Sequence, residues 1–152
     1  MRNDLIKRAR TGLQGTRRVR SVFLRRSVSD AYYALFHALA ALCADHLVGV
    51  TKRNSEAWRR VYRGLDHARV REEFRRKDVV NMDLAVGRVA AAFVQLQEAR
   101  HAADYDPLNI LRRRSDAEAW IGIAETAVAD LDGLPDDLVL DLAACLLMKR
   151  RA

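Results

Sequence analysis

The sequence predicts an all-α protein, an antiparallel bundle of five to six helices in a single domain spanning residues 1–152. Half of the residues are hydrophobic and only two are proline, so few positions would interrupt a helix. Apolar residues recur every three or four positions in several long segments, the pattern of a helix with one buried face. A chain of 152 residues is also long enough to bury a core.

The other helices are expected to pack around residues 25–47, a segment without Gly or Pro. Its apolar stripe, flanked by small alanines, consists of Val28, Tyr32, Leu35, Phe36, Leu39, Leu42 and Cys43. A separate strip carries polar groups along the edge of the expected core, namely Arg26, Asp30, Tyr33 and His37. A helix with this apolar side needs partner helices on that side.

Further helices are predicted over residues 3–13, 55–65, 82–103, 115–133 and 135–151. The highly charged residues 68–80 are expected to form a helical turn followed by a loop. We expect Asn3 or Asp4 to cap the first helix, because their side chains can accept from free backbone N–H groups. Ser115, with Glu118 three residues later, has the spacing of a capping box.

The final predicted helix contains an apolar middle, residues 138–148, with hydrophobic side chains nearly all round. Such a helix either lies centrally in the bundle, which we favour, or forms half of an oligomer interface. Pro135 and two acidic residues open it, and the basic residues 149–151 close it, both matching the helix dipole.

In the predicted helix over residues 82–103, the apolar stripe is continued by charged residues. Its inward stripe runs through Val86, Val89, Phe93 and Leu96, and the same spacing continues to Arg100 and Asp104. Two charged groups therefore stand where the core face should continue. A guanidinium there needs dedicated partners, because burying it unpaired is costly. Pro107 then closes the helix.

Charge is distributed unevenly along the chain. The formal net charge is +7, with basic segments at residues 2–26 and 52–77 and an acidic one at 116–141. A basic face could meet a polyanion such as RNA. The alternative is an ordinary arginine-rich surface facing solvent.

Composition excludes several classes of protein. No apolar run reaches the roughly 18–20 residues of a membrane span, and the charged N-terminal residues are unlike a signal peptide. Cys43 and Cys145 lie in apolar contexts, as small core residues in a reducing compartment do, and supply no metal-ligand spacing. We therefore expect a cytoplasmic protein that uses no metal and no cofactor. There is no Gly-rich phosphate loop.

Candidate reactive groups gather in residues 100–107, RHAADYDP, where Arg100, His101, Asp104 and Tyr105 fall within two turns. The structural alternative is an ordinary Arg–Asp pair at i and i+4, worth about 0.2–0.5 kcal/mol on an exposed helix.

Two further histidines stand beside basic or aromatic residues. His67 follows Arg63 and Arg60, and His37 lies one turn beyond Tyr33. Tyr33, His37 and Arg63 are candidate binding residues, and His67 is a candidate catalytic one. For both histidines, a hydrogen-bonded structural role is the alternative interpretation.

Three segments resemble the HEPN family of helical-bundle proteins. RRSVSDAYYALFHALAAL resembles the family's AYYAxFHA signature, AWRRVYRGLDHA its second element, and RHAADYDP its RxxADYDP element. The resemblance covers roughly residues 20–107, in the expected order. It implies an antiparallel bundle that commonly forms a homodimer, with the Arg motif pressed against the partner's copy. Many members are metal-independent endoribonucleases of toxin–antitoxin or phage-defence modules, often encoded beside a nucleotidyltransferase.

The active branch of the family carries an Arg followed four to six residues later by a His. Arg100 takes the Arg position, but Asp104 and Tyr105 stand where the His belongs, and His101 falls on a different face. Arg60 and His67 have the spacing but lie in another element. Tyr105 is a poor base at its ordinary pKa of about 10. The missing imidazole must then come from His37, His67, His101 or a second protomer.

We therefore expect an RNA-acting protein, with metal-independent endoribonuclease activity as the candidate reaction and Arg100 as its cation. The alternative is a catalytically inert module that binds a partner protein, such as a nucleotidyltransferase or an antitoxin. In a third, purely structural alternative, Arg100 and Asp104 only tie helices together. Tyr105 is also open to modification, since some toxins of this class are silenced by nucleotide transfer to a motif Tyr.

Overall fold

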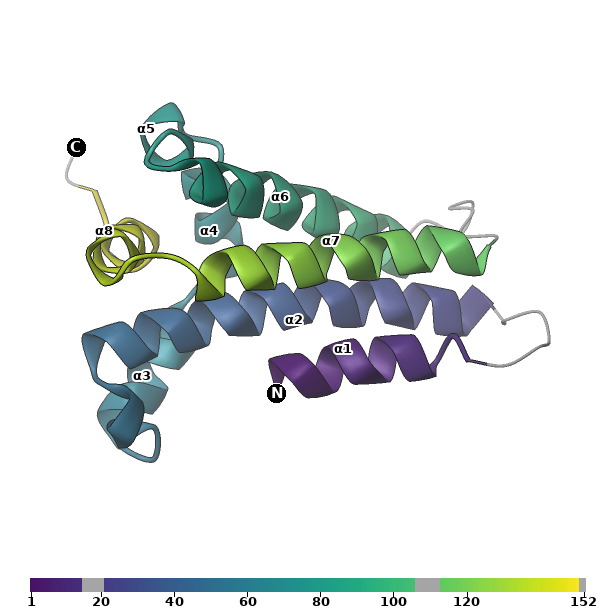
Figure 1. Ribbon diagram of the computed structural model, residues 1–152, viewed down its shortest axis with the longest axis horizontal. Coiled ribbons are helices and arrows are strands. Elements are labelled where there is room, and N and C mark those ends of the chain that lie inside the picture. Colours follow the sequence, from purple (N-terminus) through teal and green to yellow (C-terminus); the bar gives the residue numbers. More distant parts are fainter. Residues whose placement is uncertain (15–20, 106–112, 151–152) are drawn as a thin grey trace. The chain divides into compact units, whose positions relative to one another are not determined.

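The computed structural model describes residues 1–14, 21–105 and 113–150, and every regular element in them is helical (Figure 1). The elements are α1 (Arg2–Thr11), α2 (Ser21–Leu47), the 3-10 helix η1 (Val50–Lys52), α3 (Glu56–Gly64), α4 (His67–Glu73), α5 (Lys77–Val80), α6 (Leu84–Tyr105), α7 (Arg114–Asp132) and α8 (Asp136–Leu147). This confirms the all-α helical fold. The described residues contain more helices than expected, because residues 68–80 form most of two short helices, α4 and α5, instead of a turn and a loop.

The chain divides into two compact units. Unit 1 comprises Met1–His37 and Ala92–Val128, and unit 2 comprises Ala38–Ala91 and Ala129–Ala152. The long helices α2, α6 and α7 each contribute residues to both units. A single domain remains a prediction from the sequence.

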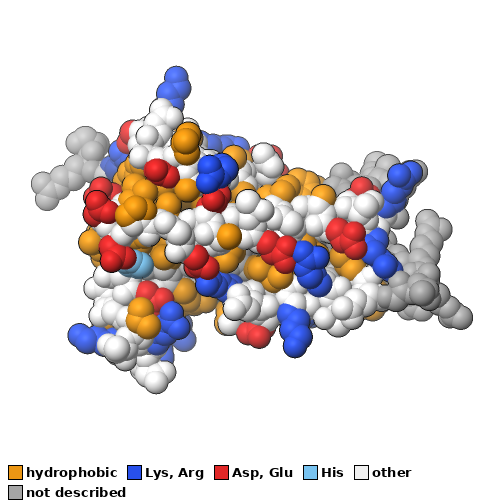
Figure 2. Space-filling view, in the orientation of Figure 1, with side chains coloured by type: hydrophobic (Ala, Val, Ile, Leu, Met, Phe, Trp, Pro, Cys, Tyr) orange, Lys and Arg blue, Asp and Glu red, His pale blue; other side chains and the backbone are white. Residues whose placement is uncertain are grey.

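In unit 1, α1 runs beside the first part of α2 (Figure 1). Ala9 and Leu24 are almost completely buried, and the Ser27 hydroxyl donates to the Ala9 carbonyl at 2.9 Å. Arg10 forms an ion pair with Glu125 of α7. Along α7, Figure 2 shows basic and acidic side chains next to each other. These contacts hold α1 against its neighbours through both apolar and charged groups.

The first part of the predicted apolar stripe of α2, from Val28 to Phe36, lies in the core of unit 1. Val28, Tyr32 and Leu35 have no exposed surface, and neither do Phe93 and Leu96 of α6. The ring centroids of Tyr32 and Phe93 lie 5.5 Å apart. The prediction is confirmed for these residues of the stripe, whereas Leu42 is only partly buried.

In unit 2, side-chain contacts join the end of α2 to the start of α3. The Ser55 hydroxyl caps α3 by accepting from the Trp58 backbone N–H at 3.2 Å. The Trp58 indole donates to the Asp45 carboxylate at 3.0 Å, and Arg53 pairs with the same carboxylate. The end of α2 and the start of α3 are therefore joined through one acid.

In the remainder of unit 2, α8 packs against α4. The Arg69 Nε donates to the Leu146 carbonyl at 3.0 Å, which satisfies an acceptor at the end of α8. One face of α8 is buried through Val139, Leu142, Ala143 and Leu146. Leu140 and Met148 are exposed, and Figure 2 shows hydrophobic and acidic side chains side by side in the region of α8. An oligomer interface on α8 remains a prediction.

The expected helix caps were wrong in detail. α1 begins at Arg2 and has no side-chain cap, so neither Asn3 nor Asp4 has the predicted role. α7 begins at Arg114, and the Asp116 carboxylate accepts from the Arg113 N–H at 3.1 Å. A carboxylate in the first turn satisfies this free donor in place of Ser115.

The basic residues expected to close the last helix lie beyond its end, because α8 stops at Leu147. Arg151 and Pro107 lie outside the described residues. In the part of the chain that the structure describes, no helix combines the length and apolar character needed to cross a bilayer.

Candidate functional site

Arg100 lies in the last turns of α6, on the extension of the buried stripe, and its side chain is 24% exposed. Its guanidinium carbon is 4.9 Å from the centroid of the Tyr33 ring and 5.3 Å from that of Tyr32. A cation at this distance is attracted by the ring electrons. The prediction that Arg100 needs dedicated partners is confirmed by these two rings and by Asp104.

The Asp104 carboxylate joins α6 to α2. One of its oxygens accepts from the Arg100 Nε at 3.2 Å, and the other accepts from the Ser29 hydroxyl at 2.8 Å. One residue earlier, the Ala103 carbonyl accepts from the Arg25 guanidinium at 2.8 Å. The last turn of α6 is thereby fixed against α2, and Arg100 with it.

Tyr32 forms the buried floor of this site. The Gln97 amide donates to its phenol oxygen at 3.4 Å. Burial raises the pKa of Tyr32 to about 12, although the charge of Arg100 and the bond from Gln97 act in the opposite direction. The phenol therefore stays neutral at physiological pH and cannot act as a general base.

His37 lies one turn further along α2, and Tyr33 contacts both it and Arg100. The His37 ring centroid is 6.2 Å from that of Tyr33 and 5.8 Å from that of Phe36. Burial lowers the pKa of His37 below its ordinary value of 6.5. Its imidazole is therefore neutral near pH 7, the form that can accept a proton.

His101 and Tyr105 occupy the end of α6, where both are exposed. Their rings contact each other with centroids 4.9 Å apart, and Tyr105 is 69% exposed. Asp104 contacts Arg100, whereas this ring pair presents a polar aromatic surface at the helix end. That arrangement leaves the Tyr105 hydroxyl within reach of another molecule.

Two of the remaining predicted residues belong to unit 2. Arg63 lies near the end of α3 and His67 begins α4, both in unit 2. Within unit 1, the structure brings together Arg100, Asp104 and Tyr33, with His37 against Tyr33. The roles proposed for all of these residues remain predictions.

Sequence reasoning missed three groups that hold the cluster together, namely Ser29, Arg25 and Gln97. Ser29 stands one turn before Tyr33, so its spacing along α2 could have indicated it. Tyr32 was assigned only to the core, although its ring also carries Arg100.

The cluster offers a fixed cation, a carboxylate that orients it, and a neutral imidazole behind one ring. In the described residues, no group of three or more His, Cys, Asp or Glu side chains is placed to hold a metal ion. The pairing of Arg100 with Asp104 within one chain agrees with the structural alternative. Arg100 nevertheless keeps part of its surface in solvent, so an anion can reach it.

Comparisons of the chain with protein-family models, with curated proteins and with solved structures gave no match. The HEPN resemblance therefore rests on the three sequence segments alone. A function has to be argued from the residues of the Arg100 cluster.

Proposed function

We propose that this chain is a HEPN-type RNA-acting protein of a toxin–antitoxin or phage-defence module, in which Arg100 binds an RNA phosphate. The observation that carries the proposal is the partly exposed Arg100 guanidinium, held by Asp104 and two tyrosine rings. A cation fixed before the reaction stabilises negative charge as it develops, without reorganising. A guanidinium also matches the geometry of phosphate oxygens.

The candidate reaction is cleavage of RNA without a metal ion. A base removes the proton of a 2′-hydroxyl, and that oxygen attacks the neighbouring phosphate. A cyclic phosphate forms as the 5′-oxygen leaves with a proton from an acid. Arg100 would stabilise the phosphorane, and neutral His37 is the candidate base. His101 is the candidate acid, from this chain or from a second protomer.

Ser29 and Asp104 would act as positioning residues, because they contact Arg100 or its partner and not the substrate. Tyr33 separates Arg100 from His37, so it would set the spacing between phosphate and base. A homodimer that pressed two copies of the site together would enclose the RNA on both sides.

The second candidate function is an inert module that binds a nucleotidyltransferase or an antitoxin. The observation in its favour is the exposed His101–Tyr105 pair at the end of α6, in place of the family's His. Aromatic residues of this kind are enriched in protein interfaces. Co-purification of a neighbour-encoded protein with the intact chain, lost in Tyr105→Ala, would favour this function.

The test of the ribonuclease proposal is a gel assay of purified protein on total RNA and tRNA with EDTA present. We expect cleavage by the wild type and loss of cleavage in His37→Ala. His67→Ala, which alters the candidate histidine of unit 2, tests whether that residue supplies the base instead. Intact RNA after incubation with a folded, dimeric wild type would overturn the ribonuclease and favour the inert module. A monomer by light scattering at micromolar concentration would refute the homodimer.

A further inference from the structure

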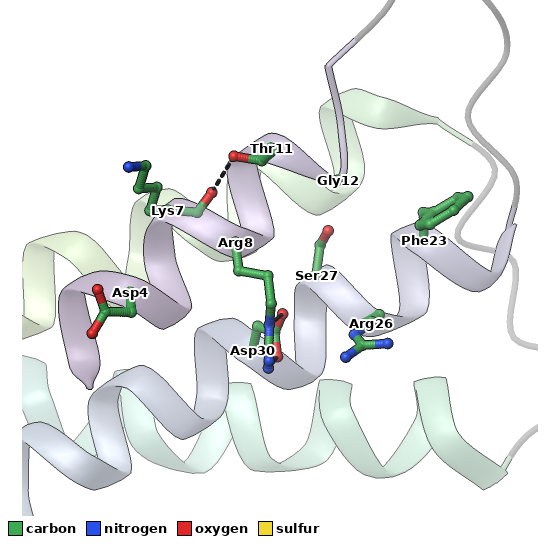
Figure 3. A pocket seen from close by; sticks show the side chains of 9 residues that line it. All are labelled: Asp4, Lys7, Arg8, Thr11, Gly12, Phe23, Arg26, Ser27 and Asp30. Atoms are coloured by element: carbon green, nitrogen blue, oxygen red, sulfur yellow. Dashed lines mark hydrogen bonds and ion pairs between the residues drawn. The ribbon is translucent and has the colours of Figure 1, made fainter.

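A cavity lies in unit 1 between α1 and α2, with a volume of about 470 Å³ (Figure 3). It is lined by Asp4, Lys7, Arg8, Thr11, Gly12, Phe23, Arg26, Ser27 and Asp30. None of these residues contributes to the Arg100 cluster. Pockets that bind small molecules measure roughly 300–1,000 Å³, so this one has room for a single small ligand.

Most polar groups of the cavity already have partners. Asp30 is only 4% exposed and forms an ion pair with Arg8, whose Nε donates to it at 2.8 Å. The Thr11 hydroxyl donates to the Lys7 carbonyl at 2.8 Å, and Ser27 donates to the Ala9 carbonyl. Figure 3 shows the Arg8 side chain reaching from α1 to Asp30 on α2. Arg8 and Asp30 therefore neutralise each other within the wall of the cavity.

Two further side chains of α2 line the cavity and are exposed to solvent. Arg26 is exposed and has no hydrogen bond or ion pair to any described residue. Phe23, three residues earlier and therefore on the same side of the helix, is 47% exposed. The Asp4 carboxylate pairs with the N-terminal ammonium at 3.0 Å, which is the main cause of its lowered pKa, and the charge of Lys7 adds a smaller effect. After these pairings, two cations of the lining, Lys7 and Arg26, have no ion pair to a described residue, and Phe23 is the aromatic residue of the lining.

We propose that this cavity binds one nucleoside phosphate, with the base stacked on Phe23 and the phosphate held by the Arg26 guanidinium. Phenylalanine rings stack on bases of any sequence, and a guanidinium can engage two phosphate oxygens at once. The ligand is either a free nucleotide or one nucleotide of a single-stranded RNA. This inference goes beyond the proposed function, since it uses other residues and holds even where Arg100 cleaves nothing.

The test is calorimetric titration of the full chain with AMP and adenosine, and fluorescence anisotropy with a labelled single-stranded oligoadenylate. The variants are Phe23→Leu and Arg26→Ala, and Arg60→Ala removes an equally exposed Arg of α3 as the matched control. We expect Arg26→Ala to weaken binding by about tenfold or more. Phe23→Leu should weaken it by about fivefold or more, and Arg60→Ala should leave it unchanged.

Comparing AMP with the oligoadenylate distinguishes a free nucleotide from a nucleotide of RNA. Binding of AMP that depends on Phe23 and Arg26 identifies a free nucleotide, and the same dependence seen only with the oligoadenylate identifies RNA. Adenosine binding as tightly as AMP would overturn the role of Arg26. Absence of binding to both AMP and the oligoadenylate, or equal binding by wild type and both variants, would overturn the site. Thermal melting checks that the variants fold, as expected for exposed positions.

Discussion

Arg100 in unit 1 and Arg150 in unit 2 show two uses of an arginine beside acids. Arg150 donates to Glu73 at 2.9–3.3 Å and pairs with Asp78 at 2.9 Å, so two carboxylates surround one guanidinium. Arg100 has one carboxylate, Asp104, and two tyrosine rings. Rings attract a cation without neutralising it. Arg150 therefore faces two carboxylates and has a structural role, whereas Arg100 is balanced by one carboxylate and keeps a partly exposed surface that an anion can approach.

The largest effect on stability should come from Arg150→Ala. Glu73 is only 8% exposed and would keep no closer basic partner among the described residues than Arg76, at 3.9 Å. A buried acceptor that loses its partner costs about 1–3 kcal/mol. We expect Arg100→Ala to cost less than about 1 kcal/mol, because Asp104 keeps the Ser29 hydroxyl. Urea unfolding followed by circular dichroism measures both, and a greater loss in Arg100→Ala would reverse the comparison.

The burial of the Tyr32 phenol beneath Arg100 predicts that the folded protein loses stability at alkaline pH. The pKa of Tyr32 is raised from 10.0 in the unfolded chain to about 12 by burial. The stability that the neutral phenol contributes is therefore complete below pH 10 and is lost as the pH rises toward 12, a loss of roughly 3 kcal/mol in all. Tyr32→Phe cannot ionise and should flatten this part of the profile. An identical slope in urea melts of both proteins at pH 10–12 would contradict the buried phenol.

The smallest effect on stability should come from His37, at acidic pH. Burial lowers its pKa below 6.5, so the folded state favours the neutral ring. The stability it contributes is present above pH 6.5 and is lost as the pH falls through the folded pKa. His37→Asn should remove part of the acid sensitivity seen in thermal melts between pH 7 and 4. NMR titration of a His37 pKa at or above 6.5 would disprove this placement.

The apolar spacing of α2 and α6 was sufficient to predict the core of unit 1 and the unusual position of Arg100. Spacing places Ser29 one turn before Tyr33 on α2, but it could not show that Ser29 contacts Asp104, because that contact depends on how α2 is rotated toward α6. A similar limit applies to Asp30, which was expected at the core edge but without Arg8 of α1 as its partner.

Unit 2 was harder to predict where charges are dense. Glu73 is buried within a charged segment because Arg150, far along the chain, pairs with it. Local spacing contains no sign of such a partner, and residues 68–80 therefore did not reveal the two short helices found there. For the same reason, Arg150 was expected to interact with the dipole of the last helix, whereas in the structure it pairs with Glu73 and Asp78.

The most direct test is the single-turnover rate of RNA cleavage in EDTA by Arg100→Ala beside wild type. Arg150→Ala, assayed at a temperature where it is folded, is the control for loss of an arginine from unit 2. Loss of one stabilising donor should slow the reaction by about 10²-fold or more, while Arg150→Ala keeps the wild-type rate. A folded Arg100→Ala that cleaves within about twofold of the wild-type rate would show that Arg100 is not the cation of the reaction.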